Sequence, residues 1–175
     1  RRGGAAVTDL AAPPGQPITA AAVRAALGGG VDLVALVHAE SATGILNPLA
    51  AIAGLARAAG ALLVVDAVAS FGGHVLDVDA LGADIVVVGP QKALGGGAGV
   101  SAVAVSPRAW AQVEAPGAAS LSTLALGDLR VNWLETGRGA LPGMPSPIEF
   151  HTLEATLDHV EAEGLAALVA RHARA

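Results

Sequence analysis

Two residues, Lys92 and Asp66, have side chains whose chemistry and placement point to a reaction. Lys92 is the only lysine among 175 residues, whereas nine arginines carry the other positive side-chain charges. A primary amine, unlike a guanidinium group, condenses with an aldehyde to form a Schiff base. If Lys92 is buried, its neutral and nucleophilic form is favoured, whereas on an exposed glycine loop it is an ordinary surface lysine.

Asp66 lies within the apolar stretch LLVVDAVAS, residues 62–70. A carboxylate there is costly to desolvate unless it meets a cation or several hydrogen-bond donors, although it could simply cap a turn at the end of a strand. A carboxylate on a neighbouring strand suits the pyridine nitrogen of pyridoxal phosphate, because the cofactor withdraws electrons best when that nitrogen is protonated. Lys92 and Asp66 together are the smallest set of residues that this cofactor needs.

The elements that must position these residues alternate along the chain. Continuous apolar, β-branched runs predict buried strands of a parallel sheet, with helices on both faces, at residues 31–39, 61–70 and 83–89. A helix is expected over 47–60, with Asn47 as its N-cap and Gly60 as its stop. Further helices are expected over 19–29, with Thr19 as the cap, and over 146–164. The strand at 100–106 follows a connection too short for a crossover helix, so we expect it to run antiparallel and make the sheet mixed.

Polar residues follow each of the three parallel strands. They are the run 38–41 after the first strand, Asp66 in the second, and Gln91 with Lys92 after the third. In an open parallel sheet, ligands bind outside the carboxyl ends of the strands. If the strands are neighbours, these residues converge on one pocket.

The composition excludes several functional classes. The net charge of −5 and the two Phe, two Trp and absent Tyr leave little basis for binding nucleic acid or anionic membrane. The absence of Cys excludes disulfides and thiolate chemistry in this chain, and the five histidines lack metal-ligand spacing, so no metal site is expected. No signal peptide or membrane span is visible, which favours a cytoplasmic enzyme or binding protein.

The glycine run GGGAGV, residues 95–100, resembles two phosphate-binding motifs only in part. It leads into a strand rather than a helix, so it would not present a helix N-terminus to a dinucleotide. Lys92 precedes the glycines, whereas the lysine of a P-loop follows them. A Gly-x-Ser-x-Gly elbow, as in serine hydrolases, is also missing from the sequence.

Three motifs, in this order and spacing, resemble a known family: HAESATGILNPL (38–49), LLVVDAVASFGG (62–73) and VVGPQKALGGGAGVS (87–101). They are similar to the class V aminotransferases of pyridoxal-phosphate fold type I, and to their alanine–glyoxylate and serine–glyoxylate group. The resemblance implies that residues 1–163 form an incomplete cofactor-binding large domain. Residues 164–175 would begin the helix leading to a small C-terminal domain, and the start at Arg1 also indicates a piece of a longer protein.

The resemblance also implies roles for individual residues. Lys92 would hold the cofactor as a Schiff base and then carry the proton between the substrate's α-carbon and the cofactor. Asp66 would pair with the pyridine nitrogen and Val68 would pack on the ring. Ser41 would bond near the phenolic oxygen, and Gln91 would contact the phosphate. Three further residues would shape the loop beneath the ring: His38, Glu40 and Thr43.

The sequence departs from the family pattern in two places. Residues 140–147 offer Leu141 and Met144 where family members often place Tyr and Thr that reach the partner subunit's phosphate. Pro90 also replaces a small hydroxyl residue that is common there. The family's phosphate-binding glycine turn and substrate-carboxylate arginine have no counterpart in this chain.

The function implied is amino transfer between a small amino acid, alanine-like or serine-like, and a 2-oxo acid such as glyoxylate or pyruvate, by a homodimer. A cysteine desulfurase or a related class V lyase is an alternative, but those enzymes place His before the lysine, where this chain has Gln91. An inactive, truncated fragment is the other alternative.

Overall fold

A computed structural model describes residues 4–114, 124–137, 144 and 146–175 of the chain. The strands are β1 (Leu33–Val37), β2 (Ala39–Glu40), β3 (Ile45–Leu46), β4 (Leu62–Asp66), β5 (Ile85–Val88) and β6 (Ala102–Val105). The α-helices are α1 (Ala20–Leu27), α2 (Leu49–Ala58), α3 (Val78–Leu81), α4 (Pro107–Val113), α5 (Leu126–Leu129), α6 (Pro147–Glu163) and α7 (Leu165–His172). A π-helical turn, η1, covers Arg130–Leu134.

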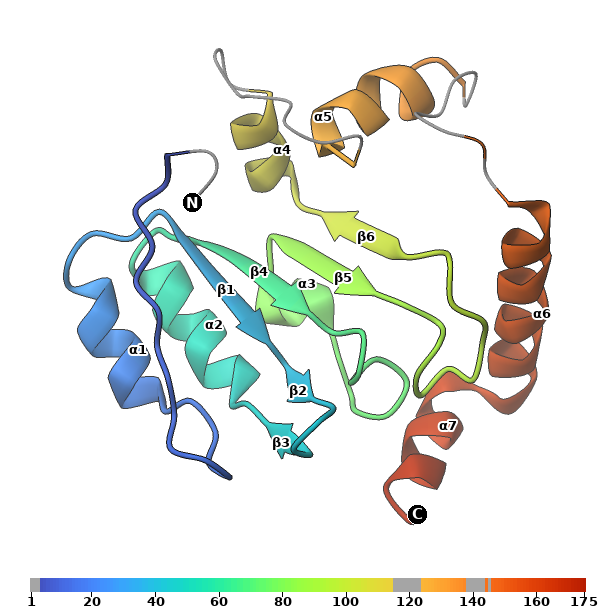
Figure 1. Ribbon diagram of the computed structural model, residues 1–175, viewed down its shortest axis with the longest axis horizontal. Coiled ribbons are helices and arrows are strands. Elements are labelled where there is room, and N and C mark those ends of the chain that lie inside the picture. Colours follow the sequence, from blue (N-terminus) through green and yellow to red (C-terminus); the bar gives the residue numbers. More distant parts are fainter. Residues whose placement is uncertain (1–3, 115–123, 138–143, 145) are drawn as a thin grey trace.

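Four strands form one sheet in the order β1-β4-β5-β6 (Figure 1). The pairs β1–β4 and β4–β5 are parallel, whereas β5–β6 is antiparallel. The expected mixed, mostly parallel sheet of an α/β fold is therefore confirmed, including the reversal after the glycine run. A separate two-stranded ribbon, β2–β3, extends from the carboxyl end of β1.

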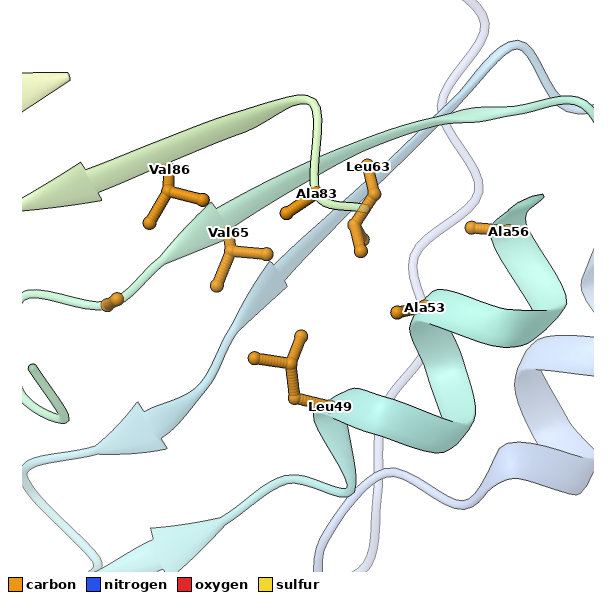
Figure 2. Packing of buried hydrophobic residues seen from close by; sticks show 8 residues of the cluster. Leu49, Ala53, Ala56, Leu63, Val65, Ala83 and Val86 are labelled. Atoms are coloured by element: carbon orange, nitrogen blue, oxygen red, sulfur yellow. The ribbon is translucent and has the colours of Figure 1, made fainter. Parts of the chain in front are cut away.

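The core lies between α2 and the centre of the sheet (Figure 2). Leu63 and Val65 of β4 are at most 2% exposed and face the α2 side chains Leu49, Ala53 and Ala56. Small alanines on α2 let the helix approach the strands closely. The outer strands are less covered than their apolar sequences predict, since Leu33 in β1 is 47% exposed and Val103 in β6 is 42% exposed.

The N-cap predicted from the sequence is correct for α1 but not for α2. Thr19 caps α1 as expected, because its hydroxyl accepts a hydrogen bond from the Ala22 amide at 3.1 Å. The expectation that Asn47 caps α2 is wrong. The buried Asn47 side chain instead accepts from the Ile18 amide at 2.9 Å and donates to the Val37 carbonyl at 2.8 Å, so it joins the N-terminal segment to β1.

All three parallel strands are shorter than expected, and β5 covers only Ile85–Val88 of the expected range 83–89. The first breaks at His38, beyond which the chain turns into the ribbon β2–β3. The second ends at Asp66, and residues 67–70 form a turn in which the Ala67 carbonyl accepts from the amides of Ser70 and Phe71. Continuous apolar sequence therefore ran past the true strand ends, because the turns are also made of small and apolar residues.

A buried carboxylate lies at the opposite, amino end of these strands. Asp84 is 3% exposed and accepts hydrogen bonds from the Leu63 amide at 2.8 Å, the Ser106 hydroxyl at 2.9 Å and the guanidinium of Arg108. Burial alone would raise the pKa of Asp84, but the bonds from Arg108, Leu63 and Ser106 outweigh it and hold the pKa below its usual value. This network fastens α4 to the sheet.

The described chain closes with two consecutive helices. α6 ends at Glu163, Gly164 has a φ of 84°, and α7 begins at Leu165. His151 and His159 are exposed on α6. No helix within the described ranges is long and apolar enough to cross a membrane.

Candidate functional site

The carboxyl ends of β1, β4 and β5 lie side by side, as the sequence predicts (Figure 1). Asp66 is the central residue of this edge, because it is in register with Val37 of β1 and Val87 of β5. The amide of His38 donates to the Asp66 carbonyl at 2.9 Å, and the Ala67 amide donates to the Val87 carbonyl at 2.9 Å. Backbone bonds therefore bring the three predicted site segments to one edge of the sheet.

The Asp66 side chain is exposed at this edge, in contrast to the buried Asp84. Its Oδ1 accepts a hydrogen bond from the Val68 amide at 2.9 Å, which orients the carboxylate over the turn. Val68 itself is half-buried. Within the described residues Asp66 has no ion-pair partner, so its negative charge faces outward and is free for a ligand.

Lys92 is exposed in the turn that follows β5, and it too has no ion-pair partner among the residues described. Of the two alternatives for Lys92, a buried residue or one on an exposed glycine loop, the structure shows the exposed one. The Gln91 side chain lies back over Gly89, at a place where a Cβ on Gly89 would collide with it. Gly89 and Pro90 are buried, so they anchor the turn that carries Gln91 and Lys92.

His38 is buried and does not project toward the edge of the site as a free side chain. It is 6% exposed, and its Nδ1 lies 2.9 Å from the hydroxyl of Ser70, which is fully buried. Burial, assisted by the nearby His74, lowers the pKa of His38, so the ring is neutral at pH 7. Ser70 was missed in the sequence, where it is one small residue within a glycine-rich and alanine-rich turn.

The ribbon after His38 carries the remaining predicted residues. Glu40 Oε1 accepts from the Ala42 amide at 3.0 Å, and the Glu40 carbonyl accepts from the Gly44 amide at 2.8 Å. Glu40 therefore shapes the turn 41–44 through these two hydrogen bonds. Ser41 and Thr43 are exposed on this turn, and their side chains are not packed into the protein.

The glycines after Lys92 serve to bring α6 close to the site loop (Figure 1). A Cβ on Gly97 would lie 3.0 Å from Thr152, and a Cβ on Gly99 would lie 2.6 Å from Glu149. Gly72 lets the loop after β4 pack closely on the loop after β5, because a Cβ on Gly72 would lie 2.9 Å from Leu94. Residues 140–143 and 145, within the segment singled out for cross-subunit contacts, lie outside the described part, whereas Met144 is exposed.

We expect Gly96→Ala to loosen this site loop. The new Cβ would lie 2.7 Å from the Pro90 ring and 2.7 Å from the Thr156 hydroxyl of α6. Overpacking of this kind destabilises a protein by about 1–3 kcal/mol, and here it also separates α6 from the Lys92 turn. Denaturant unfolding measures the first effect, and cofactor titration of the variant measures the second.

Gly54→Ala is the matched control. Gly54 is an exposed position within α2, and a Cβ there meets nothing within 4 Å. This change should stabilise the helix by about 0.5–1 kcal/mol and leave cofactor affinity unchanged. Equal stability of the two variants would contradict the close packing of α6 on the glycine run.

The residues at this edge fit pyridoxal phosphate by their chemistry. One carboxylate and one primary amine stand exposed at the ends of adjacent strands, and neither neutralises the other through an ion pair. Such a pair suits a ligand that offers a protonated ring nitrogen to Asp66 and an aldehyde to Lys92. No group of three His, Asp or Glu side chains able to hold a metal ion occurs among the described residues.

Comparison with known proteins agrees with this chemistry. The family model described as "Aminotransferase class-V" matches residues 1–175. The pyridoxamine–pyruvate transaminase of Mesorhizobium japonicum is 40% identical over 144 residues, which make up 82% of this chain and 36% of that protein.

Two solved structures extend the likeness to the fold. The ureidoglycine–glyoxylate aminotransferase of Bacillus subtilis superposes with a TM-score of 0.89 at 28% identity, covering 98% of this chain and 44% of that one. The alanine–glyoxylate aminotransferase of Nostoc sp. gives a TM-score of 0.80 at 33% identity, covering 98% of this chain and 45% of that one. The chain thus spans less than half the length of these relatives. It belongs to the class V aminotransferases, a family of fold type I enzymes whose cofactor is pyridoxal phosphate.

Proposed function

We propose that the protein to which this chain belongs transfers amino groups between a small amino acid and a 2-oxo acid such as pyruvate or glyoxylate. The observation that carries the proposal is the exposed pair of Lys92 and Asp66 at the ends of adjacent strands. Relatives named as pyruvate-dependent and glyoxylate-dependent transaminases support the choice of acceptor.

When bound, pyridoxal phosphate supplies a sink for the electron pair released at the substrate's α-carbon. The amine of Lys92 would hold the cofactor through its aldehyde group, and it would also serve as the general base and acid that accepts the substrate's α-proton and returns it. The carboxylate of Asp66 keeps the ring nitrogen protonated. Its hydrogen bond from the Val68 amide holds it in place for this role.

Other residues bind the cofactor or position the loops around it. Val68 lies next to Asp66 on the turn and packs against the ring. Gln91 contacts the phosphate, and Ser41 bonds near the phenolic oxygen. His38 supports the loop beneath the ring without touching the cofactor, because it is buried and hydrogen-bonded to Ser70.

The larger assembly is part of the same proposal. Residues 1–163 form part of the large domain, and the helix from 164 leads to a small domain. The enzyme acts in the cytoplasm as a homodimer. The apolar side chains that remain exposed on α6, such as Ile148 and Phe150, are consistent with further protein covering that helix.

A direct test incubates the full-length protein with pyridoxal phosphate, ¹⁵N-labelled alanine or serine, and either pyruvate or glyoxylate. Mass spectrometry should detect the ¹⁵N label in the amino acid formed from the acceptor. Release of sulfur from cysteine would instead favour the desulfurase alternative, and a folded protein without any cofactor-dependent reaction would favour the inactive alternative.

A further inference from the structure

The buried residues His38 and Ser70 flank Asp66 along the backbone, because the His38 amide bonds to the Asp66 carbonyl and Ser70 lies four residues after Asp66. Ser70 is fully buried and His38 is 6% exposed, and both are polar. Burying polar groups is unfavourable unless they bond each other, so this pair constrains the local structure tightly.

The hydrogen bonds of the pair form a continuous relay. The Ser70 hydroxyl donates to the Ala67 carbonyl at 3.3 Å, which uses its only proton. His38 Nδ1 lies 2.9 Å from the same hydroxyl oxygen, and the two side chains are hydrogen-bonded. The side chain of His38 is thus linked through Ser70 to the first residue of the turn 67–70.

The backbone of His38 fixes the other end of this relay. Its amide donates to the Asp66 carbonyl at 2.9 Å, and its carbonyl accepts from the Asn47 amide at 2.8 Å. His38 therefore cannot shift without disturbing both β4 and the ribbon β2–β3. A rigid point of the sheet is connected to the turn by two side-chain hydrogen bonds.

That turn determines where the charge of Asp66 points. The Val68 amide, inside the turn, donates to Asp66 Oδ1 at 2.9 Å. We propose that Ser70 is a positioning residue, which holds the turn 67–70 through His38 and so fixes the direction of the Asp66 carboxylate. The inference rests on the proposed function and adds to it a residue that touches neither substrate nor cofactor.

Ser70→Ala in the full-length protein removes the centre of the relay with the loss of one oxygen atom. Without cofactor, hydrogen–deuterium exchange at the Val68 amide should become about tenfold faster, which corresponds to the loss of roughly one hydrogen bond. The dissociation constant of pyridoxal phosphate should also rise about tenfold. His38→Asn, which keeps a hydrogen-bonding amide group near the position of Nδ1, should show smaller changes in both measurements.

Ser106→Ala is the matched control. Ser106 also donates from a serine hydroxyl, to Asp84 at 2.9 Å, but it lies at the opposite end of the strands. It should lower overall stability while leaving Val68 exchange and cofactor affinity as in the wild type. If Ser70→Ala behaves like Ser106→Ala in both measurements, the positioning role is wrong.

The two proposals fail in different ways. A wild-type protein that binds no pyridoxal phosphate contradicts the proposed function. Exchange at Val68 is measured without cofactor, so unchanged exchange in Ser70→Ala overturns the role of Ser70 in either case.

Discussion

Lys92→Ala is expected to abolish both the visible absorption of bound pyridoxal phosphate and amino transfer by the full-length protein. Acid–base catalysis alone contributes about 10²–10⁴-fold to such rates, and Lys92 also provides the covalent attachment, so we expect a loss of at least about 10³-fold. Because Lys92 is exposed, its removal should change the free energy of unfolding by no more than about 0.5 kcal/mol. Absorption spectra and steady-state rates measure the effect, and denaturant unfolding confirms the fold.

Lys92→Arg is the informative control for this prediction. Arginine keeps the positive charge and much of the length of the side chain, but its guanidinium group does not condense with an aldehyde. If the lone lysine is needed as an amine, the arginine variant should be as inactive as the alanine variant. Substantial activity in Lys92→Arg would mean that Lys92 acts only as a charge.

Asp66→Asn is expected to lower kcat by about 10²–10³-fold, because it removes the charge that keeps the cofactor ring nitrogen protonated while leaving a side chain of the same shape. Asn retains an oxygen that can accept from the Val68 amide, so the turn should survive. The charge matters most as electrons move into the ring, so kcat should fall more than the substrate KM rises. Asp66→Ala, which also removes the hydrogen bond, should be at least as slow.

Asp79→Asn provides the matched control for Asp66. It removes one carboxylate charge from an exposed position in α3, away from the carboxyl edge of the sheet. Its kcat should equal that of the wild type. A near-normal kcat in Asp66→Asn would rule out the role assigned to this residue.

The framework of the site could be read from the sequence because it depends on local patterns. Continuous β-branched runs gave the three parallel strands, and the short glycine connection gave the antiparallel β6. The sequence placed Asp66 and Lys92 at one edge only on the condition that these strands are neighbours, and the order β1-β4-β5 meets that condition. These features need only neighbouring residues along the chain.

The parts that could not be predicted depend on contacts between distant residues. Ser70 bonds to His38 across 32 positions, and Asp84 meets Arg108 across 24. A glycine is needed at position 96 because Thr156 of α6 packs against it, and no local pattern of glycines could indicate that contact. Asn47 has the residue type of a helix cap, yet its amide is used to join the N-terminal segment to β1.

The central claim is that Lys92 holds pyridoxal phosphate covalently. Borohydride reduction of the full-length protein with its cofactor, followed by peptide mass spectrometry, tests it most directly. We expect one pyridoxyl group per chain, on the peptide that contains Lys92, and its loss in Lys92→Arg. A pyridoxyl group on a different residue, or none on a protein shown to be folded and saturated with the cofactor, would contradict the claim.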